Sequence, residues 1–345
     1  MRVIAIGATG FIGRHVVDQL AAAGHEVAVV HRGGTPLCAR PGVTEILGER
    51  SSLLDLRPAF RAWSPDVAID MILSSAGQAR QTLEALRGVA GRVVAISSGD
   101  VYRAMAVVHR LEGSPLEPVP LTEESALRSQ PHPYTREALA AARSAYPWID
   151  DDYDKVRVEQ AIASDLGLRA TILRLPMVYG PGDPLHRLHP LLKRMADGRP
   201  AILLGRSQAR CVSCLGYVEN VAAAIALAAV SLRAAGRIYN VADPDPFTEA
   251  EWASKIGALA GWQGRILALP PEKLPPHLQL SYNFEQHLFM DSTRIRTELD
   301  YAEPVPLDEA LRRTIEWEQS NPPRQIDAAR FDYAAEDAAI ACQDT

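Results

Sequence analysis

MRVIAIGATGFIGRHVVDQLAAAG, residues Met1 to Gly24, decides the fold of this chain. The run from Val3 to Ile6 is short, apolar and rich in β-branched residues, which is typical of a buried central strand. It ends at Gly7, and apolar residues then recur at helical spacing until Gly24, a natural helix stop. The stretch therefore predicts a strand, a tight turn and a helix.

Three glycines of this turn have separate predicted roles. Gly7 permits the turn, Gly10 lets a pyrophosphate approach the backbone, and Gly13 lets the helix pack close to the strand. The spacing is G-x-x-G-x-x-G, and a second apolar run, Val27 to Val30, completes a βαβ unit. The helix N-terminus would direct its free amides and positive dipole end at phosphates. The predicted dinucleotide contacts in this unit are Gly7, Gly10, Phe11, Ile12 and Gly13.

Composition limits the classes of function. The chain has 345 residues and a net charge of −6, which argues against general nucleic-acid binding. No apolar run is long enough to cross a bilayer, and a strand starting at residue 2 leaves no room for a signal peptide. We therefore expect a cytoplasmic protein that has no membrane partner and acts on a small molecule, with a homodimer as one option.

Cysteines are few and scattered, at Cys38, Cys211, Cys214 and Cys342. Cys211 and Cys214 form a C-x-x-C, but a structural zinc site needs two more ligands at recognisable spacing. We therefore predict neither a disulfide framework nor a metal site.

Strands and helices alternate along the first half of the chain, which predicts a doubly wound parallel α/β sheet of the Rossmann type. One predicted strand, Arg92 to Ser98, ends in polar residues. Ligands of such sheets bind at the carboxyl ends of strands, where Ser97, Ser98, Asp100 and Tyr102 are expected to lie.

The end of the predicted strand Val27 to Val30 bears on which dinucleotide binds. An acidic residue here would bind the ribose hydroxyls of NAD, but the sequence has His31 and Arg32. Because a guanidinium suits a phosphate, Arg32 favours NADP(H), with NAD as the alternative.

Three segments, GATGFIG, SSGDVY and LRLPMVYGPGD, resemble the extended short-chain dehydrogenase/reductase superfamily, which contains the NAD-dependent epimerases and dehydratases. The resemblance implies that Ser98 polarises a substrate oxygen. It also implies that backbone near Pro176 and Val178 meets the nicotinamide amide.

Asp100 stands where sugar dehydratases of this superfamily carry a glutamate. Nucleotide-sugar members supply an arginine to the diphosphate; Arg210 is the nearest candidate, and its unusual spacing argues against such a substrate.

In this superfamily a tyrosine and a lysine four residues apart act on one helix face: the lysine holds the nicotinamide ribose and lowers the phenol pKa. Here Tyr153 and Lys155 are only two apart. Arg157 could replace the lysine, Asp151 could stand at the tyrosine place, or Tyr134 could reach in from the preceding loop. We favour a fourth arrangement, in which the helix begins after Tyr153 and lets Tyr153 and Lys155 cooperate.

The predicted organisation is a dinucleotide-binding domain over residues 1–183 with returning segments near 212–245, a smaller α/β substrate lobe over 184–320, and a tail over 321–345. In the lobe, Thr248 and Glu251 predict a capping box for the helix that carries Trp252. The tail has no clear core pattern, and we expect it to be partly disordered or to wrap the body.

The predicted function is hydride transfer between nicotinamide C4 and a secondary alcohol or ketone carbon, as in oxidoreductases, epimerases and dehydratases of this type. Sugar derivatives are among the candidate substrates. The predicted catalytic residues are Ser98, Tyr153 and Lys155, and Lys155 would also hold the cofactor. The alternative, motivated by the Tyr153 and Lys155 spacing, is a non-catalytic dinucleotide-binding sensor or partner-binding protein.

Overall fold

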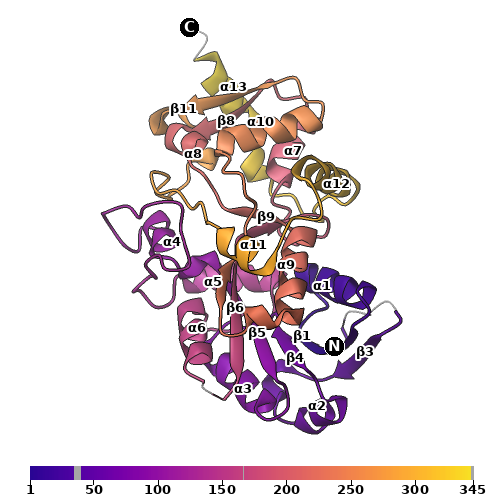
Figure 1. The fold of residues 1–345 in the computed structure, drawn as a ribbon. Helices are drawn as coiled ribbons and strands as arrows, with labels where there is room; N and C mark the ends of the chain where they lie inside the picture. Colours follow the sequence, from indigo (N-terminus) through magenta and orange to yellow (C-terminus); the bar gives the residue numbers. More distant parts are fainter. Residues whose placement is uncertain (35–39, 166, 343–345) are drawn as a thin grey trace.

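A computed structural model describes residues 1–34, 40–165 and 167–342, so Cys38 lies outside the described residues. Its centre is a seven-stranded parallel sheet in the order β10-β6-β5-β4-β1-β2-β3 (Figure 1). The strands are β1 (Arg2–Ile6), β2 (Glu26–His31), β3 (Val43–Leu47), β4 (Val67–Asp70), β5 (Arg92–Ser98), β6 (Arg169–Leu175) and β10 (Ile238–Asn240). This confirms the predicted doubly wound fold, and the strand order reverses between β1 and β4.

Both faces of this sheet are covered by helices. Successive β1 side chains enter opposite cores: Val3 packs with residues of α1 (Phe11–Ala22) and α9 (Val218–Val230), and Ile4 with residues on the other face. The second core is covered by α2 (Arg57–Trp63), α3 (Ala76–Leu86) and α6 (Lys155–Ala163). A strand buried on both faces needs the continuous apolar run that the sequence shows.

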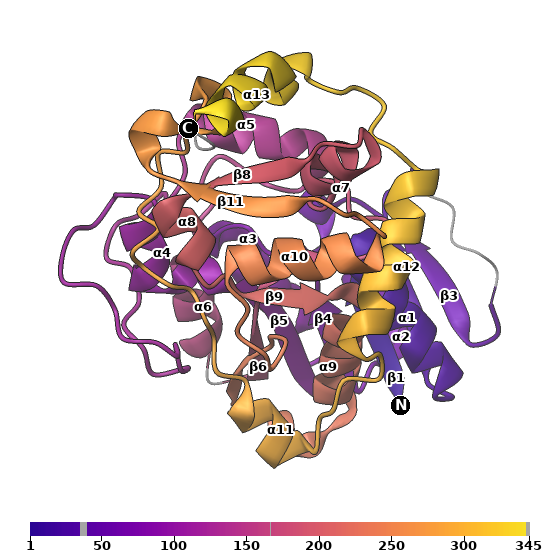
Figure 2. The ribbon, with the colours of Figure 1, turned by 90° about the horizontal axis from the view of Figure 1, so that it is seen from above.

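The smaller lobe lies beyond the carboxyl edge of the sheet (Figures 1 and 2). It contains the parallel pair β8 (Ala201–Gly205) and β11 (Arg265–Leu269). Its helices include α7 (His189–Ala196), α8 (Arg206–Arg210), α10 (Glu249–Leu259), α12 (Leu307–Ser320) and α13 (Tyr333–Ala341). Between lobe and sheet, β7 (Met177–Tyr179) pairs with β9 (Leu215–Tyr217), and α11 (Thr293–Leu299) follows further along. The predicted capping box of Thr248 and Glu251 is present at the start of α10.

The run from Thr44 to Leu47 forms part of β3 at the sheet edge and is largely exposed. Two helices, α4 (Arg103–Val108) and α5 (Arg136–Ala145), lie in the long connection between β5 and α6. The tail is anchored: the fully buried carboxylate of Glu336 in α13 accepts hydrogen bonds from Arg194 at 2.6 Å. No helix of the described chain is both long and apolar enough to span a bilayer.

Candidate active site

The glycine turn after β1 has the shape that a dinucleotide requires. Gly7 has a φ of +73°, which favours glycine, and a Cβ on Gly13 would lie 2.4 Å from the Cα of Ala8. Gly10 differs, because a Cβ there would meet nothing within 4 Å. It is the N-cap of α1 and offers no side-chain cap, so the first amides of the helix are free for a ligand. Open space before free helical amides fits a bound pyrophosphate.

Arg32 lies directly after β2, at the edge of the sheet where the Gly7 turn begins. The amide of Gly7 donates to the carbonyl of Val30 at 2.9 Å, so the end of β2 adjoins the glycine turn. Arg32 is exposed, whereas His31 is buried and accepts a hydrogen bond from the amide of Gly33 at 3.2 Å. The guanidinium is thus accessible beside the turn.

Four of the polar side chains near the end of β5 converge. The hydroxyl of Tyr153 donates to Oδ2 of Asp100 at 2.6 Å, and the hydroxyl of Tyr134 approaches the same oxygen at 3.4 Å. The amide of Asp100 donates to Oγ of Ser98 at 3.2 Å. Ser98 is half-buried and caps the following 3₁₀ turn, but its own hydroxyl proton stays available to donate. Sequence reasoning named each of these residues without predicting the Asp100 contacts.

Burial controls the protonation of this cluster. It raises the pKa of the Asp100 carboxyl, against the opposing effects of the Tyr153 hydrogen bond and of Arg128. Burial and the nearby Asp100 carboxylate raise the pKa of Tyr153 well above its usual range. Oδ1 of Asp100 is buried and has no hydrogen-bond partner in the described structure. The raised pKa values favour the protonated forms of both groups, which suits the pair to act as an acid.

Lys155 is buried against the ends of two strands. Its Nζ donates to the carbonyl of Leu73, after β4, at 2.5 Å and to that of Ile96 in β5 at 2.9 Å. An ammonium group has three donors, so one remains for another acceptor. Burial lowers the pKa of Lys155 to about 8. Among the described residues, no hydrogen bond joins Lys155 to Tyr153, but Tyr153 donates to Asp100 and the charge of Asp100 acts on Lys155.

The start of α6 distinguishes between the arrangements that the sequence allowed for the catalytic tyrosine and lysine. The helix begins at Lys155, with Asp154 as its N-cap. Tyr153 therefore precedes the helix, and helical geometry does not fix the direction of its side chain relative to that of Lys155. Asp151 points away, because its side chain is 93% exposed and pairs with Arg143 at 2.5 Å. The side chain of Arg157 is 55% exposed. Tyr153 and Tyr134 therefore remain as the phenols at Asp100.

Ser97 and Tyr102 were grouped with the site by sequence, but the structure gives them another role. The hydroxyl of Ser97 donates to Glu159 at 2.6 Å, and Glu159 accepts from Arg174 at 2.7 Å. Arg174 also donates to the hydroxyl of Tyr102 at 3.0 Å, which in turn donates to Asn240 at 2.6 Å. This buried network ties α6 to β5, β6 and β10. Its members are saturated with hydrogen bonds and support the site from behind.

The turn after β6 lies beside Ser98, because Ser98 pairs with Leu175 across the sheet. The next residue, Pro176, packs on Gly216, where a Cβ would lie 2.8 Å from its ring. Val178 is buried, and its carbonyl accepts a hydrogen bond from Arg187 at 2.9 Å. The backbone expected to meet a nicotinamide is thus held firmly next to Ser98.

The structure gives no functional role to three other residues that the sequence raised, which are Cys211, Cys214 and Arg210. Burial raises the pKa of Cys211 to about 11 and of Cys214 to about 12, which disfavours a reactive thiolate. Arg210 is exposed and lies 3.7 Å from Glu285, its ion-pair partner.

The sheet and the open glycine turn define a doubly wound enzyme fold that binds a dinucleotide at the carboxyl ends of its strands. Within this class, the chain belongs to the NAD dependent epimerase/dehydratase family, whose model matches residues 3–242. It is therefore an enzyme of the extended short-chain type that uses a nicotinamide dinucleotide, as its sequence motifs predicted.

Individual relatives share less than a third of their residues with this chain over the matched regions. The 2'-dehydrokanamycin reductase of Streptomyces kanamyceticus is 28% identical over 279 residues, or 79% of this chain and 70% of that enzyme. The uncharacterized protein y4nL of Sinorhizobium fredii is 29% identical over 190 residues, and the match spans about half of its length, 52%.

Among solved structures, the UDP-glucuronic acid 4-epimerase of Bacillus cereus, in complex with UDP-glucuronic acid and NAD, superimposes with a TM-score of 0.67. That match covers 93% of this chain and 99% of the epimerase at 15% identity. It shows a shared fold.

Proposed function

We propose that this enzyme reduces a ketone of a small, sugar-like molecule to a secondary alcohol with NADPH. The observation that carries the proposal is the 2.6 Å hydrogen bond between Tyr153 and Asp100 beside Ser98. Because burial favours the protonated forms of both groups, the cluster is suited to supply protons, as reduction of a ketone requires. A relative that is itself named a reductase supports the same direction.

The residues present fit a nicotinamide dinucleotide. Gly7, Gly10 and Gly13 with the first amides of α1 would hold the pyrophosphate. The spare N–H of Lys155 would hold the nicotinamide ribose, and backbone at Pro176 and Val178 would meet the amide. When bound, the reduced cofactor supplies the hydride.

Side chains of the protein then position and protonate the carbonyl oxygen of the ketone. The Ser98 hydroxyl donates a hydrogen bond to the carbonyl oxygen and holds it in place. The Tyr153 phenol gives its proton to that oxygen as the alcohol forms. The Asp100 carboxyl, 2.6 Å away, returns a proton to Tyr153, and solvent reprotonates Asp100. One hydride and one proton thus convert the ketone to an alcohol.

Arg32 supports NADPH over NADH. It is exposed at the end of β2, and neither it nor His31 supplies the carboxylate that would bind a free ribose diol. We also keep the two-domain division, the cytoplasmic location and the homodimer as predictions that follow from the sequence.

The test is NADPH oxidation with a panel of keto sugars, followed by the variants Tyr153→Phe and Tyr134→Phe. Tyr153→Phe should lower kcat by roughly 10²- to 10⁴-fold, the usual contribution of a positioned acid, with NADPH affinity unchanged. Tyr134→Phe is the matched control, because the Tyr134 oxygen lies 3.4 Å from Asp100. It should lower kcat far less than Tyr153→Phe does. NADPH binding without turnover of any ketone would instead favour the non-catalytic sensor.

A further inference from the structure

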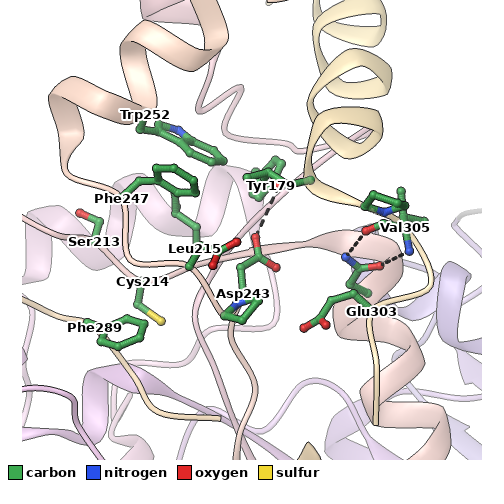
Figure 3. A pocket seen from close by; sticks show the side chains of 15 residues that line it. Tyr179, Ser213, Cys214, Leu215, Asp243, Phe247, Trp252, Phe289, Glu303 and Val305 are labelled. Carbon is green, nitrogen blue, oxygen red and sulfur yellow. Dashed lines mark hydrogen bonds between the residues drawn. The ribbon is translucent and has the colours of Figure 1, made fainter. Parts of the chain in front are cut away.

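A cavity of about 180 Å³ lies where β9, the segment after β10, α10 and the segment before α12 meet (Figure 3). Its volume corresponds to about six water molecules at their share of liquid volume, enough for a substituent or a small ring. The lining residues are Tyr179, Ser213, Cys214, Leu215, Asn220, Asp243, Pro244, Asp245, Phe247, Trp252, Phe289, Glu303, Val305, Pro306 and Leu307.

Aromatic rings form much of its wall. Trp252 packs edge-on against Tyr179, with ring centroids 5.3 Å apart, and tilts against Phe247 at 6.2 Å. Phe289 lies across the cavity from these rings in Figure 3. Aromatic faces carry negative electrostatic potential and attract organic cations.

The polar part of the lining is acidic. Asp243, Asp245 and Glu303 contribute carboxylates, and the lining, within the described residues, contains no Lys, Arg or His. Arg296 approaches from behind, but it is held by Glu303, with one contact at 2.7 Å, and by the carbonyl of Ala242 at 2.9 Å. Lys255 lies over the Phe247 ring at 5.9 Å, but it pairs with Asp308 at 2.7 Å. The carboxylates of the lining therefore outnumber the cations beside it that have no other partner, and the cavity is acidic.

Asp243 is a carboxylate of the lining that contacts the aromatic wall. The hydroxyl of Tyr179 approaches its Oδ2 at 3.5 Å, as Figure 3 shows. Burial, together with the charge of Glu303, raises the pKa of Asp243 to about 7. A cation placed beside this carboxylate would remove the cost of its ionisation.

The cavity adjoins the candidate active site. Phe289 lines it, and the next residue, Met290, packs on Gly99: a Cβ there would lie 2.8 Å from the Met290 sulfur. Met290 and the lining residue Cys214 belong to one apolar cluster. Phe289, Met290 and Gly99 thus connect the cavity to the Ser98 end of β5.

We propose that this cavity binds an organic ammonium group and that the substrate of the enzyme carries it as a protonated amine. The second part rests on the proposed function. A cavity of suitable size, several aromatic rings and an acidic lining are three independent features, and an alkylammonium group satisfies all of them.

A nucleoside diphosphate is a poor occupant of the same space. Its negative charges would face Asp243 and Asp245, which are not balanced by a cation of the lining. The hydroxyl of Ser213, which could donate to an anion, already donates to Glu249 at 2.6 Å. These contacts exclude the phosphates from the cavity and favour a cationic group.

The test uses the full-length protein and two pairs of probes that differ in ammonium against hydroxyl: glucosamine with glucose, and benzylamine with benzyl alcohol. Binding is followed by ligand-observed NMR, and NADPH binding is measured on the same protein. At least one amine should bind about tenfold or more tightly than its neutral partner, as one hydrogen bond to a charged group implies. Asp243→Asn should remove most of this preference.

The control variant is Asp300→Asn, because the Asp300 side chain is 79% exposed and lies on the surface. It should keep the preference for amines. Equal binding within both pairs, no detectable binding of either amine, or an unchanged preference in Asp243→Asn would each overturn the inference. If NADPH binds while the amines do not, the inference alone fails; if the amines bind while NADPH does not, the proposed function fails.

Discussion

The substitutions Gly10→Ala and Gly13→Ala should separate cofactor binding from folding, although the two glycines lie one helical turn apart. At Gly13 a Cβ would lie 2.4 Å from the Cα of Ala8 and 2.7 Å from its carbonyl oxygen. Both are backbone atoms, so α1 itself would have to move. At Gly10 the added Cβ meets nothing within 4 Å, and the φ of −82° suits alanine.

These distances set the expected magnitudes. Gly13→Ala should lower the free energy of unfolding by about 3 kcal/mol, the upper end of the usual cost of overpacking. Gly10→Ala should lower it by no more than ~1 kcal/mol, the usual cost of a poorer N-cap. Because the Gly10 methyl group would occupy the space of the pyrophosphate, NADPH affinity should fall about tenfold or more, equal to ~1.4 kcal/mol.

Urea unfolding measures the first quantity, and NADPH fluorescence titration measures the second. The expected result is a stable Gly10→Ala protein that binds NADPH poorly and a destabilised Gly13→Ala protein. Wild-type NADPH affinity in Gly10→Ala would refute the placement of the pyrophosphate over this residue.

Three further changes test other parts of the site. Arg32→Glu should reverse the cofactor preference by weakening NADPH and sparing NADH, and equal loss of both would contradict a role in phosphate binding. The kcat should fall as pH rises through the ionisation of the proton-donating cluster; Asp100→Asn should alter this profile, while a profile identical to that of the wild type would exclude Asp100 from proton supply. Because the pKa of Asp243 is raised from 3.8 to about 7, its contribution to stability is present below about pH 4 and is lost as pH rises through about 7. The stability of Asp243→Asn relative to wild type should therefore grow by ~2–4 kcal/mol between about pH 4 and about pH 8 in urea unfolding, and a difference independent of pH would contradict the assigned ionisation.

The sheet could be predicted from the sequence because its signals are local. Val3 to Ile6 shows a continuous apolar run, and the glycines that follow it fix the turn and the helix. The strand Arg92–Ser98 was predicted with its observed bounds. A tail that wraps the body was one of two expectations, but the contact that anchors it could not be predicted, because Glu336 binds Arg194, a residue far away in the sequence.

The site was predictable residue by residue but not as a set of contacts. A resemblance could point to Ser98 and Lys155, yet the hydrogen bond from Tyr153 to Asp100 joins residues 53 positions apart. Ser97 shows the opposite case, since its position at a strand end suggested chemistry while its actual partner is the buried Glu159. Partners of this kind depend on how α6 packs on the sheet.

A crystal structure of the protein with NADP⁺ tests the central claim most directly. We expect the pyrophosphate over Gly10, the 2'-phosphate near Arg32, and nicotinamide C4 facing the hydroxyls of Ser98 and Tyr153 at the carboxyl end of β5. A nicotinamide ring that lies away from Ser98 and Tyr153 would contradict the proposed chemistry.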